Sequence, residues 1–215
     1  YTCSIILATG GSPRKLGVPG ENELYGKGVS YCAVCDGFFY RGKTVVVVGG
    51  GDSALEESLY LAKIAAKVFL FHRRDEFRGS MILQKRVWAE SKIEILFNTI
   101  VTSVKAEKNE VSGVKIQAVN SGEERDLATD GVFIFIGFIP NNELVPSGTQ
   151  KNEDGFVVTS NRCETRHSGI FVVGDLRDKY YRQILTAAAD GCTAALTAAH
   201  YVEEMKATNP ALQPK

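Results

Sequence analysis

A glycine-rich turn joins a β-branched run to a helical segment near the start of the second quarter of the chain. Val45 to Val48 form the run, Gly49-Gly50-Gly51 follows, and residues 52–63 place Leu55, Leu59 and Ala62 on one helical face. A second apolar run, residues 67–71, comes next. This order and length are typical of a strand–helix–strand unit. A continuous apolar strand is expected inside a parallel sheet that is covered on both faces.

The turn itself matches the pattern G-x-G-x-x-A. In a dinucleotide-binding site the first glycine allows the tight turn and the second lets the backbone approach a pyrophosphate. The small third residue lets helix and strand pack closely. A plain strand–helix turn that needs a positive φ is the alternative, but the flanking strands favour dinucleotide binding. The predicted contacts are Gly49, Gly50, Gly51, Asp52, Ser53 and Ala54.

Basic residues follow the second strand of this unit. An NAD site usually has an acidic residue there, whereas this chain has His72, Arg73 and Arg74, with Arg78 close behind. A guanidinium group stays charged and binds phosphate through two hydrogen bonds. A solvated basic turn is the alternative interpretation. The position relative to Gly49 favours a site for the 2′-phosphate of NADPH.

A Cys-x-x-Cys motif precedes the glycine-rich turn. Cys32 and Cys35 are two residues apart, and Asp36 follows directly. This spacing suits a short-loop disulfide that is easily reduced and reformed, and Asp36 is placed to transfer a proton. A zinc site would need two further ligands, but the other cysteines and the histidines are scattered, so no metal is predicted. Two incidental buried cysteines are a further alternative, and thiol–disulfide chemistry is favoured.

The remaining segments alternate between strands and helices. A strand is expected over residues 3–8, a helix over 81–91, and strands over 93–97, 101–106, 111–119 and 132–136. Beyond Pro140 a strand over 170–173 and a long helix over 183–205 follow. No repeat of solenoid period is present. The chain is therefore expected to have an α/β fold.

Charge and composition exclude some classes of function. The 215 residues carry 25 basic and 25 acidic side chains, so there is no general field for nucleic acid or an anionic membrane. No apolar run reaches the roughly 18–20 residues that span a bilayer, and the first residues do not resemble a signal peptide. Five cysteines are an odd count for a disulfide framework. A soluble, cytoplasmic protein is expected.

Several motifs together resemble the low-molecular-weight thioredoxin reductases. The cysteine segment Cys-Ala-Val-Cys-Asp-Gly-Phe-Phe (32–39), the glycine segment (49–57) and His-Arg-Arg-Asp-Glu-Phe-Arg (72–78) have the family's order and spacing. Ala-Thr-Gly (8–10), Phe-Ile-Gly-Phe-Ile-Pro-Asn (135–141), Gly-Asp (174–175) and Tyr-Arg-Gln (181–183) also match. The similarity covers nearly the whole chain.

The resemblance implies two Rossmann-like three-layer nucleotide-binding domains. An NADPH domain with the redox cysteines, residues 18–140, would be inserted into an FAD domain formed by residues 1–17 and 141–215, with hinges near Gly17 and Pro140. The family's own first strand, glycine motif and helix, which bind the FAD pyrophosphate, precede the part that matches here. The FAD domain is therefore expected to be incomplete at its N-terminal side.

The resemblance also assigns roles to individual residues. Cys35 would face the flavin, Cys32 would attack the disulfide of thioredoxin, and Asp36 would act as acid and base. Ile136 and Gly137 would join the NADPH site. The FAD contacts would be Thr9, Gly10, Gly174, Asp175, Arg182, Gln183 and Ile184.

The implied function is an NADPH-dependent thioredoxin-disulfide reductase with FAD as the second cofactor, dimeric when complete. A flavoprotein subunit that reduces peroxiredoxins and a catalytically incomplete NADPH-binding fragment are the alternatives. A ferredoxin-dependent reductase is disfavoured because Arg73, Arg74 and Arg78 retain the basic NADPH signature.

Overall fold

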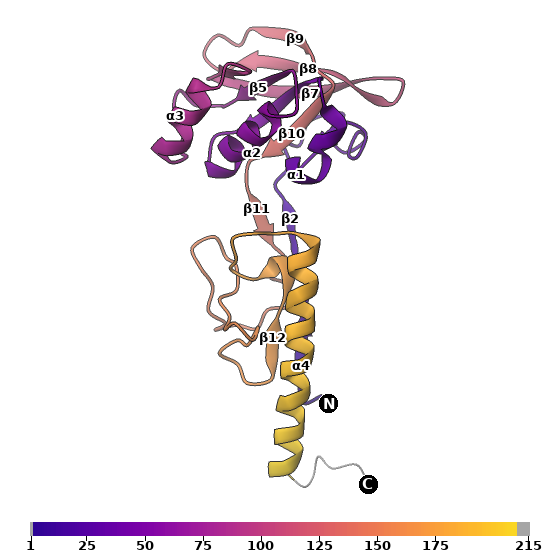
Figure 1. The fold of residues 1–215 in the computed structure, drawn as a ribbon, viewed down its shortest axis with the longest axis vertical. Coiled ribbons are helices and arrows are strands. Elements are labelled where there is room, and N and C mark those ends of the chain that lie inside the picture. Colours follow the sequence, from indigo (N-terminus) through magenta and orange to yellow (C-terminus); the bar gives the residue numbers. More distant parts are fainter. Residues whose placement is uncertain (1, 210–215) are drawn as a thin grey trace. The chain divides into compact units, whose positions relative to one another are not determined.

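The computed structural model describes residues 2–209, and the chain divides into two compact units (Figure 1). One unit is the continuous segment Pro13–Gly137, and the other combines Tyr1–Ser12 with Phe138–Lys215. The sequence-based limits of the inserted domain were residues 18 and 140. Tyr1 and residues 210–215, which the predicted FAD-domain segments include, lie outside the described residues.

The unit Pro13–Gly137 is built on a five-stranded parallel sheet. Its strands, in spatial order, are β3 (Val29–Ser30), β10 (Gly131–Phe135), β4 (Thr44–Gly49), β5 (Lys67–Phe71) and β6 (Ile93–Leu96). The central strand β4 contains four consecutive valines, of which Val45, Val46 and Val47 have no exposed surface. Branched side chains that point to both faces of a covered sheet explain this run.

Helices cover one face of this sheet and a second sheet covers the other (Figure 1). Val45 and Val47 pack with helices α1 (Ala33–Asp36), α2 (Asp52–Ala62) and α3 (Met81–Ala89), and the short η1 (Gly37–Tyr40) continues α1. Val46 and Val48 pack with the antiparallel sheet β7 (Thr99–Glu107), β8 (Glu110–Ala118) and β9 (Glu124–Ala128). The unit therefore has three layers, as predicted, with an antiparallel sheet as the third.

The second unit has a smaller set of elements. Strand β1 (Ile5–Leu7) pairs in parallel with β12 (Ile170–Val172), and η2 (Gly174–Leu176) leads towards the long helix α4 (Ile184–Thr208). Two small apolar clusters fill it, one around Phe171 and Ala194 and one around Leu7 and Leu176. Strands β2 (Gly11–Pro13) and β11 (Phe138–Pro140) form a two-stranded ribbon, and the chain crosses between the units within β2 and directly before β11.

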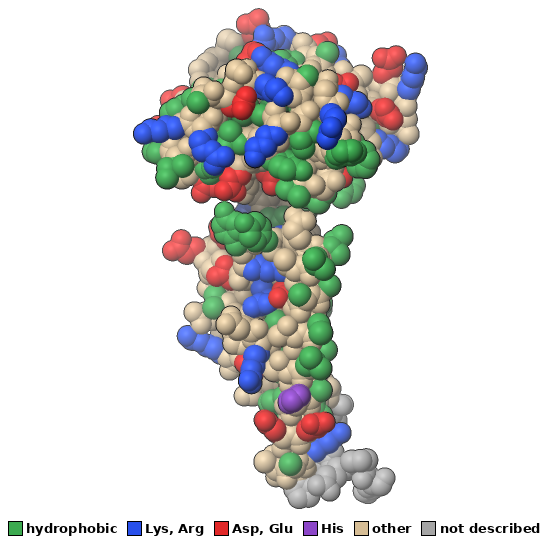
Figure 2. All heavy atoms as spheres, viewed as in Figure 1, with side chains coloured by type: hydrophobic (Ala, Val, Ile, Leu, Met, Phe, Trp, Pro, Cys, Tyr) green, Lys and Arg blue, Asp and Glu red, His purple; other side chains and the backbone are tan. Residues whose placement is uncertain are grey.

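Apolar side chains are exposed along α4 (Figure 2). Ile184, Leu185 and Leu196 are 90%, 80% and 62% exposed. None of the described helices is long and apolar enough to cross a membrane.

The expected elements are present, with differences at their ends. The predicted strand over residues 3–8 is hydrogen-bonded only over Ile5–Leu7, where it has β12 as its neighbour. Strand β9 was not predicted because its sequence, Glu-Arg-Asp-Leu-Ala, is polar and mostly exposed at the edge of its sheet. The short strands β2, β3 and β11 carry too few residues for a periodic signal.

Candidate functional site: a glycine turn, a disulfide and a polar cradle

The predicted NADPH residues gather at one edge of the parallel sheet. Gly49 ends β4 directly opposite Phe135 at the end of β10, so Ile136 and Gly137 follow at the same edge. His72 comes immediately after β5, which pairs with β4 on its other side. Parallel strands place their carboxyl ends together, and ligands of open α/β sheets bind at that edge. The fold therefore brings all these residues into one region of the unit Pro13–Gly137.

The three glycines of the turn have different surroundings. A Cβ atom on Gly49 would collide with the backbone oxygen of Phe135 and lie 2.6 Å from the Cβ of Ala54. A Cβ on Gly50 would collide with the imidazole of His72. A Cβ on Gly51 would meet no atom within 4 Å. The first two glycines are thus required by packing, whereas Gly51 leaves open space.

That open space suits a phosphate group. Gly51 is the N-cap of α2, and it provides no side-chain cap for the first N–H groups of the eleven-residue helix. Free N–H groups and the positive end of the helix dipole favour an anion there. The residues present therefore fit the pyrophosphate of a dinucleotide. Asp52 has a different contact, because its Oδ1 accepts a hydrogen bond from the backbone N–H of Ser80 at 2.6 Å.

The basic segment after β5 is hydrogen-bonded to the glycine turn. The backbone N–H groups of Arg78 and Gly79 donate to the carbonyl oxygen of Gly50 at 2.8 and 3.1 Å. Phe77 is buried and packs between His72 and Phe97. The side chains of Arg73, Arg74 and Arg78 remain exposed to solvent. The turn thus offers three guanidinium groups to a ligand without burying any of them.

His72 is the buried member of this segment. It is 6% exposed, and its Nε2 atom is buried without a hydrogen-bond partner among the described residues. Burial lowers the pKa of His72, and the positive charges of Arg78, Arg74 and Arg73 lower it further. The imidazole is therefore neutral at pH 7 and packs over Gly50.

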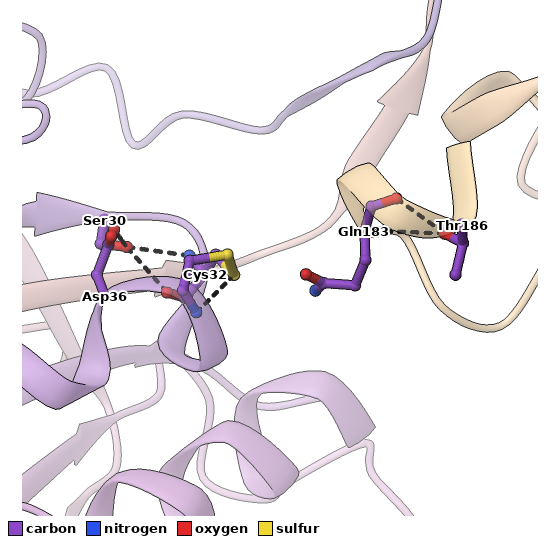
Figure 3. Close-up of a disulfide and its surroundings, with 6 residues drawn as sticks. Ser30, Cys32, Asp36, Gln183 and Thr186 are labelled. Atoms are coloured by element: carbon purple, nitrogen blue, oxygen red, sulfur yellow. Dashed lines mark hydrogen bonds between the residues drawn. A yellow bond between two sulfur atoms is a disulfide. The ribbon is translucent and has the colours of Figure 1, made fainter. Parts of the chain in front are cut away.

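Cys32 and Cys35 form a disulfide, with their Cα atoms 5.3 Å apart (Figure 3). Cys32 is the N-cap of α1, and its Sγ accepts a hydrogen bond from the backbone N–H of Cys35 at 3.1 Å. Cys35 is exposed and Cys32 is half-buried. The predicted pair is thus confirmed as a disulfide, at the start of a single helical turn.

Ser30 orders this turn, and no pattern in the sequence indicates this role. Its hydroxyl donates to Oδ2 of Asp36 at 2.6 Å and accepts from the backbone N–H of Cys32 at 3.1 Å (Figure 3). Ser30 is 2% exposed. The contact fixes the carboxylate of Asp36 relative to the cysteines. Only the pairing of β3 with β10 shows that Ser30 is held in the sheet next to the turn.

Exposed apolar side chains lie within a few residues of the disulfide in the sequence. Val34, Phe38 and Phe39 are 54%, 65% and 70% exposed, and the guanidinium of Arg41 lies 5.2 Å from the ring centre of Phe38. Large apolar groups that cluster on a surface mark contacts with other macromolecules. The surface around the disulfide is therefore suited to a protein substrate.

The predicted FAD residues all lie in the other unit. The hydroxyl of Thr9 donates to the carbonyl of Asn141 at 2.7 Å, and the amide of Asn141 donates back to the carbonyl of Thr9 at 2.8 Å. Gly10 has φ +67°, and its carbonyl accepts from the backbone N–H of Asn141. Asn141 thus fixes this turn. In the sequence it stands out only as the last residue of the motif at 135–141.

Gly174, Asp175, Arg182 and Gln183 form the second part of that candidate site. Oδ1 of Asp175 and Nε of Arg182 are buried without hydrogen-bond partners among the described residues. The Arg182 guanidinium lies 3.8 Å from the ring centre of Phe156. Burial lowers the pKa of Arg182, and the Asp175, Asp178 and Asp154 carboxylates oppose this effect. A buried acceptor and a buried donor without partners fit a polar ligand such as FAD.

Gln183 and Ile184 begin the last helix. Gln183 and Thr186 form a capping box at the start of α4 (Figure 3). Gln183 is therefore the N-cap of this helix, whereas Ile184 is 90% exposed.

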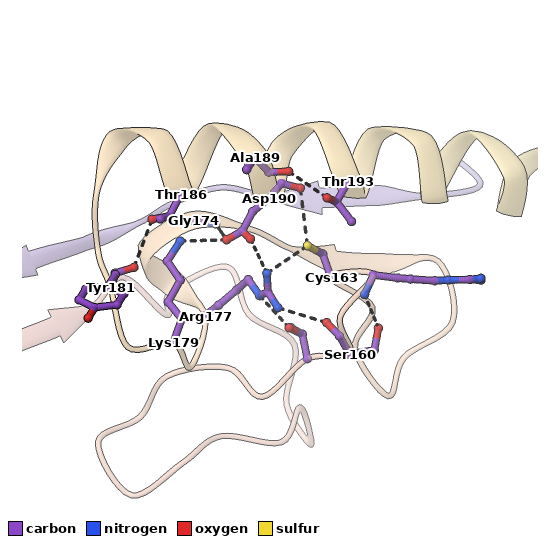
Figure 4. A network of polar contacts seen from close by, with 12 residues as sticks. Ser160, Cys163, Gly174, Arg177, Lys179, Tyr181, Thr186, Ala189, Asp190 and Thr193 are labelled. Carbon is purple, nitrogen blue, oxygen red and sulfur yellow. Dashed lines mark hydrogen bonds and ion pairs between the residues drawn. The ribbon is translucent and has the colours of Figure 1, made fainter.

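A charge cluster that the sequence did not reveal holds the Gly174 turn. The carboxylate of Asp190 on α4 pairs with Arg177 at 2.5 Å and with Lys179 at 2.9 Å, and it accepts the Gly174 N–H at 3.1 Å (Figure 4). Arg177 also donates to the thiol sulfur of Cys163 at 3.3 Å. Burial raises the pKa of that thiol. The two cations precede Asp190 by 13 and 11 residues, and the packing of α4 beside the Gly174 turn brings the three together.

The chain is similar to known flavoprotein reductases. Residues 2–191 match the family described as pyridine nucleotide-disulphide oxidoreductase. The chain is 48% identical to the thioredoxin reductase of Bacillus subtilis, covering 95% of this chain and 65% of that protein. It is 45% identical to the thioredoxin reductase of Treponema pallidum, with 96% and 67% covered. The chain therefore spans about two thirds of the length of these relatives.

Solved structures give the same result for the fold. The structure of thioredoxin reductase from Streptococcus pyogenes has a TM-score of 0.89 at 43% identity, with 94% of this chain and 66% of that chain covered. The thioredoxin reductase from Giardia duodenalis has a TM-score of 0.86 at 38% identity, with 93% and 66% covered.

Proposed function

This chain belongs to the thioredoxin reductases of the pyridine nucleotide-disulphide oxidoreductase family, and we propose that it forms the NADPH-binding and disulfide-bearing part of an enzyme that reduces thioredoxin. The observation that carries the proposal is the Cys32–Cys35 disulfide in the same unit as the glycine turn. The curated relatives named above are all thioredoxin reductases, so the peroxiredoxin-reducing alternative is not favoured.

The cofactors of the proposed enzyme are NADPH and FAD. NADPH would be held by the turn at Gly51 and by Arg73, Arg74 and Arg78. FAD would be held by Thr9, Gly10 and the turn at Gly174 and Asp175, with Arg182 and Gln183 beside it. Together the two cofactors supply a pair of electrons to the disulfide. Because the proposed NADPH residues lie in a different unit from the proposed FAD residues, NADPH binding is testable without the flavin.

The cysteines then carry out a dithiol–disulfide exchange. In the proposed sequence the Cys32 thiolate attacks one sulfur of the substrate disulfide, and the bond between the two substrate sulfurs breaks. Asp36 gives a proton to the sulfur that leaves. The Cys35 thiolate next attacks Cys32, which reforms the Cys32–Cys35 disulfide and releases the second substrate thiol. The apolar side chains of Val34, Phe38 and Phe39 support a protein as the substrate.

We also propose a cytoplasmic location and a homodimer. Three cysteines, Cys3, Cys163 and Cys192, are free thiols in the described structure, which suits a reducing compartment. The apolar side chains exposed on α4 support an association through the unit that contains this helix.

Anaerobic titration with NADPH tests the proposed enzyme. In the flavin-loaded protein the visible flavin bands should bleach, and two new thiols should appear that are lost on Cys35→Ser. Cys35→Ser should also trap thioredoxin in a mixed disulfide with Cys32, whereas Cys32→Ser should not. A chain that binds NADPH but neither holds flavin nor gains thiols would contradict the proposal and would support an NADPH-binding fragment.

A further inference from the structure

The loop that leads from β5 to α3 contains Arg78, the last of the three arginines of the basic segment. The side chain of Arg78 is exposed, whereas Phe77 and Gly79 on either side of it are buried. Strand β5 ends at Phe71, so the strand itself does not fix the position of Arg78. Contacts of the loop with other elements must therefore place this guanidinium.

Gln84 on α3 supplies two of these contacts. Its side chain is 8% exposed, and its Nε2 atom donates to the carbonyl oxygen of Gly79 at 2.7 Å and to that of Phe77 at 3.5 Å. A glutamine amide has two N–H groups, so one side chain binds the carbonyls of the residues on both sides of Arg78. A buried amide is favourable only when it is hydrogen-bonded, and here the loop provides the acceptors.

The N–H groups of the same loop are bound to the glycine turn. Those of Arg78 and Gly79 donate to the carbonyl oxygen of Gly50. The N–H of Ser80 donates to Oδ1 of Asp52, the first residue of α2. The loop is therefore held between the start of α2 on one side and a buried side chain of α3 on the other.

Arg73 and Arg74 are placed by other contacts. They lie within three residues of the end of β5, and the carbonyl oxygen of Arg74 accepts from the backbone N–H of Asn98 at 3.0 Å. Asn98 directly precedes β7 and does not belong to α3. A change at Gln84 is therefore expected to displace Arg78 and to leave the other two arginines in position.

We propose that Gln84 is a positioning residue for recognition of the 2′-phosphate of NADPH, which acts by holding Arg78 and does not contact the cofactor. The proposal rests on the proposed function, because it concerns the same NADPH site. Without the two hydrogen bonds the loop adopts further conformations, and the apparent Kd rises by the factor by which the binding-competent fraction falls. NADH lacks the 2′-phosphate, so its Kd should change little.

The test compares the Kd values of the whole chain for NADPH and NADH in Gln84→Met, without flavin. Methionine is of similar length and has no N–H donor. The Kd for NADPH should rise about three- to tenfold, and that for NADH less than about twofold. An unfolded fraction weakens both cofactors equally, so the ratio of the two Kd values reports on the site even in a destabilised variant. Gln84→Leu gives the same measurement if Gln84→Met does not fold.

Double variants test whether the effect passes through Arg78. In Arg78→Gln the Kd for NADPH should rise, and adding Gln84→Met should then have no further effect on the Kd ratio. Added to Arg73→Gln, the same change should keep its full effect. Gln117→Met is the matched control, because the amide of Gln117 on β8 also donates to a glycine carbonyl, that of Gly122 at 3.2 Å.

Hydrogen exchange of the peptide that contains Arg78 and Gly79 is a readout without any cofactor, and it should become faster in Gln84→Met. An unchanged Kd ratio in Gln84→Met, an equal shift in Gln117→Met, or full additivity with Arg78→Gln would overturn the proposal. A parent chain that does not bind NADPH would contradict the proposed function as well. Normal binding with an unchanged ratio would overturn only the role of Gln84.

Discussion

Asp36 illustrates how the site depends on single polar contacts. It follows Cys35 in sequence, and its carboxylate is bound by the Ser30 hydroxyl, which also accepts the N–H of Cys32. One hydroxyl group therefore links the proposed acid to the backbone of the proposed attacking cysteine. A hydrogen bond to a charged partner contributes about 1.5–3 kcal/mol, which is enough to keep the carboxylate in one orientation.

Arg73 and Arg74 should determine the preference between the two nicotinamide cofactors. In Arg73→Gln/Arg74→Gln the affinity for NADPH should fall on the order of tenfold or more, because hydrogen bonds to the 2′-phosphate are charge-assisted. The affinity for NADH, which lacks this phosphate, should change little. Fluorescence titration gives both Kd values. Arg86→Gln, an exposed arginine on α3, is the control, and an unchanged ratio of the two Kd values in the double variant would contradict the assignment.

His72 should make the stability of the fold depend on pH. Its pKa is below the ordinary value of 6.5 in the folded chain, so the unfolded chain binds the proton more readily. The free energy of unfolding should be highest above about pH 6.5 and should fall as the pH decreases below it, by about 1.4 kcal/mol at most for each unit of pKa difference. Urea unfolding between pH 5 and 8 measures this.

Two variants show how much His72 contributes to the pH dependence of the free energy of unfolding. In His72→Gln the fall in stability towards pH 5 should be smaller than in the parent chain, whereas His200→Gln on the exposed side of α4 should retain the full fall. Equal pH dependence in all three chains would show that His72 is not the group responsible.

At the scale of elements, the turn between β4 and α2 contains one glycine that packing requires, Gly49, and one that is expected to contact the ligand, Gly51. In Gly49→Ala the new Cβ would collide with the backbone oxygen of Phe135, which cannot move aside, so the free energy of unfolding should fall by about 1–3 kcal/mol. In Gly51→Ala the new Cβ meets no atom, and the loss should be only about 0.5–1 kcal/mol because alanine is a poorer N-cap than glycine. The NADPH affinity should nevertheless fall by roughly tenfold or more, since the methyl group fills the space for the pyrophosphate.

Urea unfolding and NADPH titration of the same two variants check this. Gly191→Ala on α4 meets no atom within 4 Å and should stabilise the chain by about 0.5–1 kcal/mol, as expected inside a helix. Normal NADPH binding by a folded Gly51→Ala variant would place the pyrophosphate elsewhere.

At the scale of the whole molecule, the unit Pro13–Gly137 should fold independently. It is continuous in sequence and has its own two apolar clusters, and the backbone N–H of Arg14 donates to the carbonyl of Gly137 at 2.9 Å. Its two ends are thus adjacent, as is common for inserted domains. Expressed alone, residues 13–137 should unfold cooperatively in urea and bind NADPH within about threefold of the affinity of the whole chain.

The rest of the chain provides the contrast for this experiment. Residues 1–12 and 138–215 are two separate segments, which among the described residues pair through the short strands β1 with β12 and β2 with β11. Joined by a short linker, they should show a less cooperative transition. A non-cooperative transition in residues 13–137 instead would mean that this unit needs the other for its stability.

The sequence alone determined the chemistry that lies within short segments. The glycine turn, the basic residues after β5 and the cysteine pair each lie within one short connection that follows a strand, and the local constraints on such a connection are strong. The fold class followed from the same patterns, because apolar runs and helical periodicity report burial directly. Likewise, the predicted strand at residues 67–71 coincides with β5.

Only the tertiary structure decided which distant residues serve these segments. Ser30 reaches Asp36 because β3 joins the edge of the sheet. Asp190 meets Arg177 and Lys179 because α4 passes over the Gly174 turn. Such contacts depend on where whole elements pack, and a polar residue in a sequence looks the same whether it faces solvent or a buried partner.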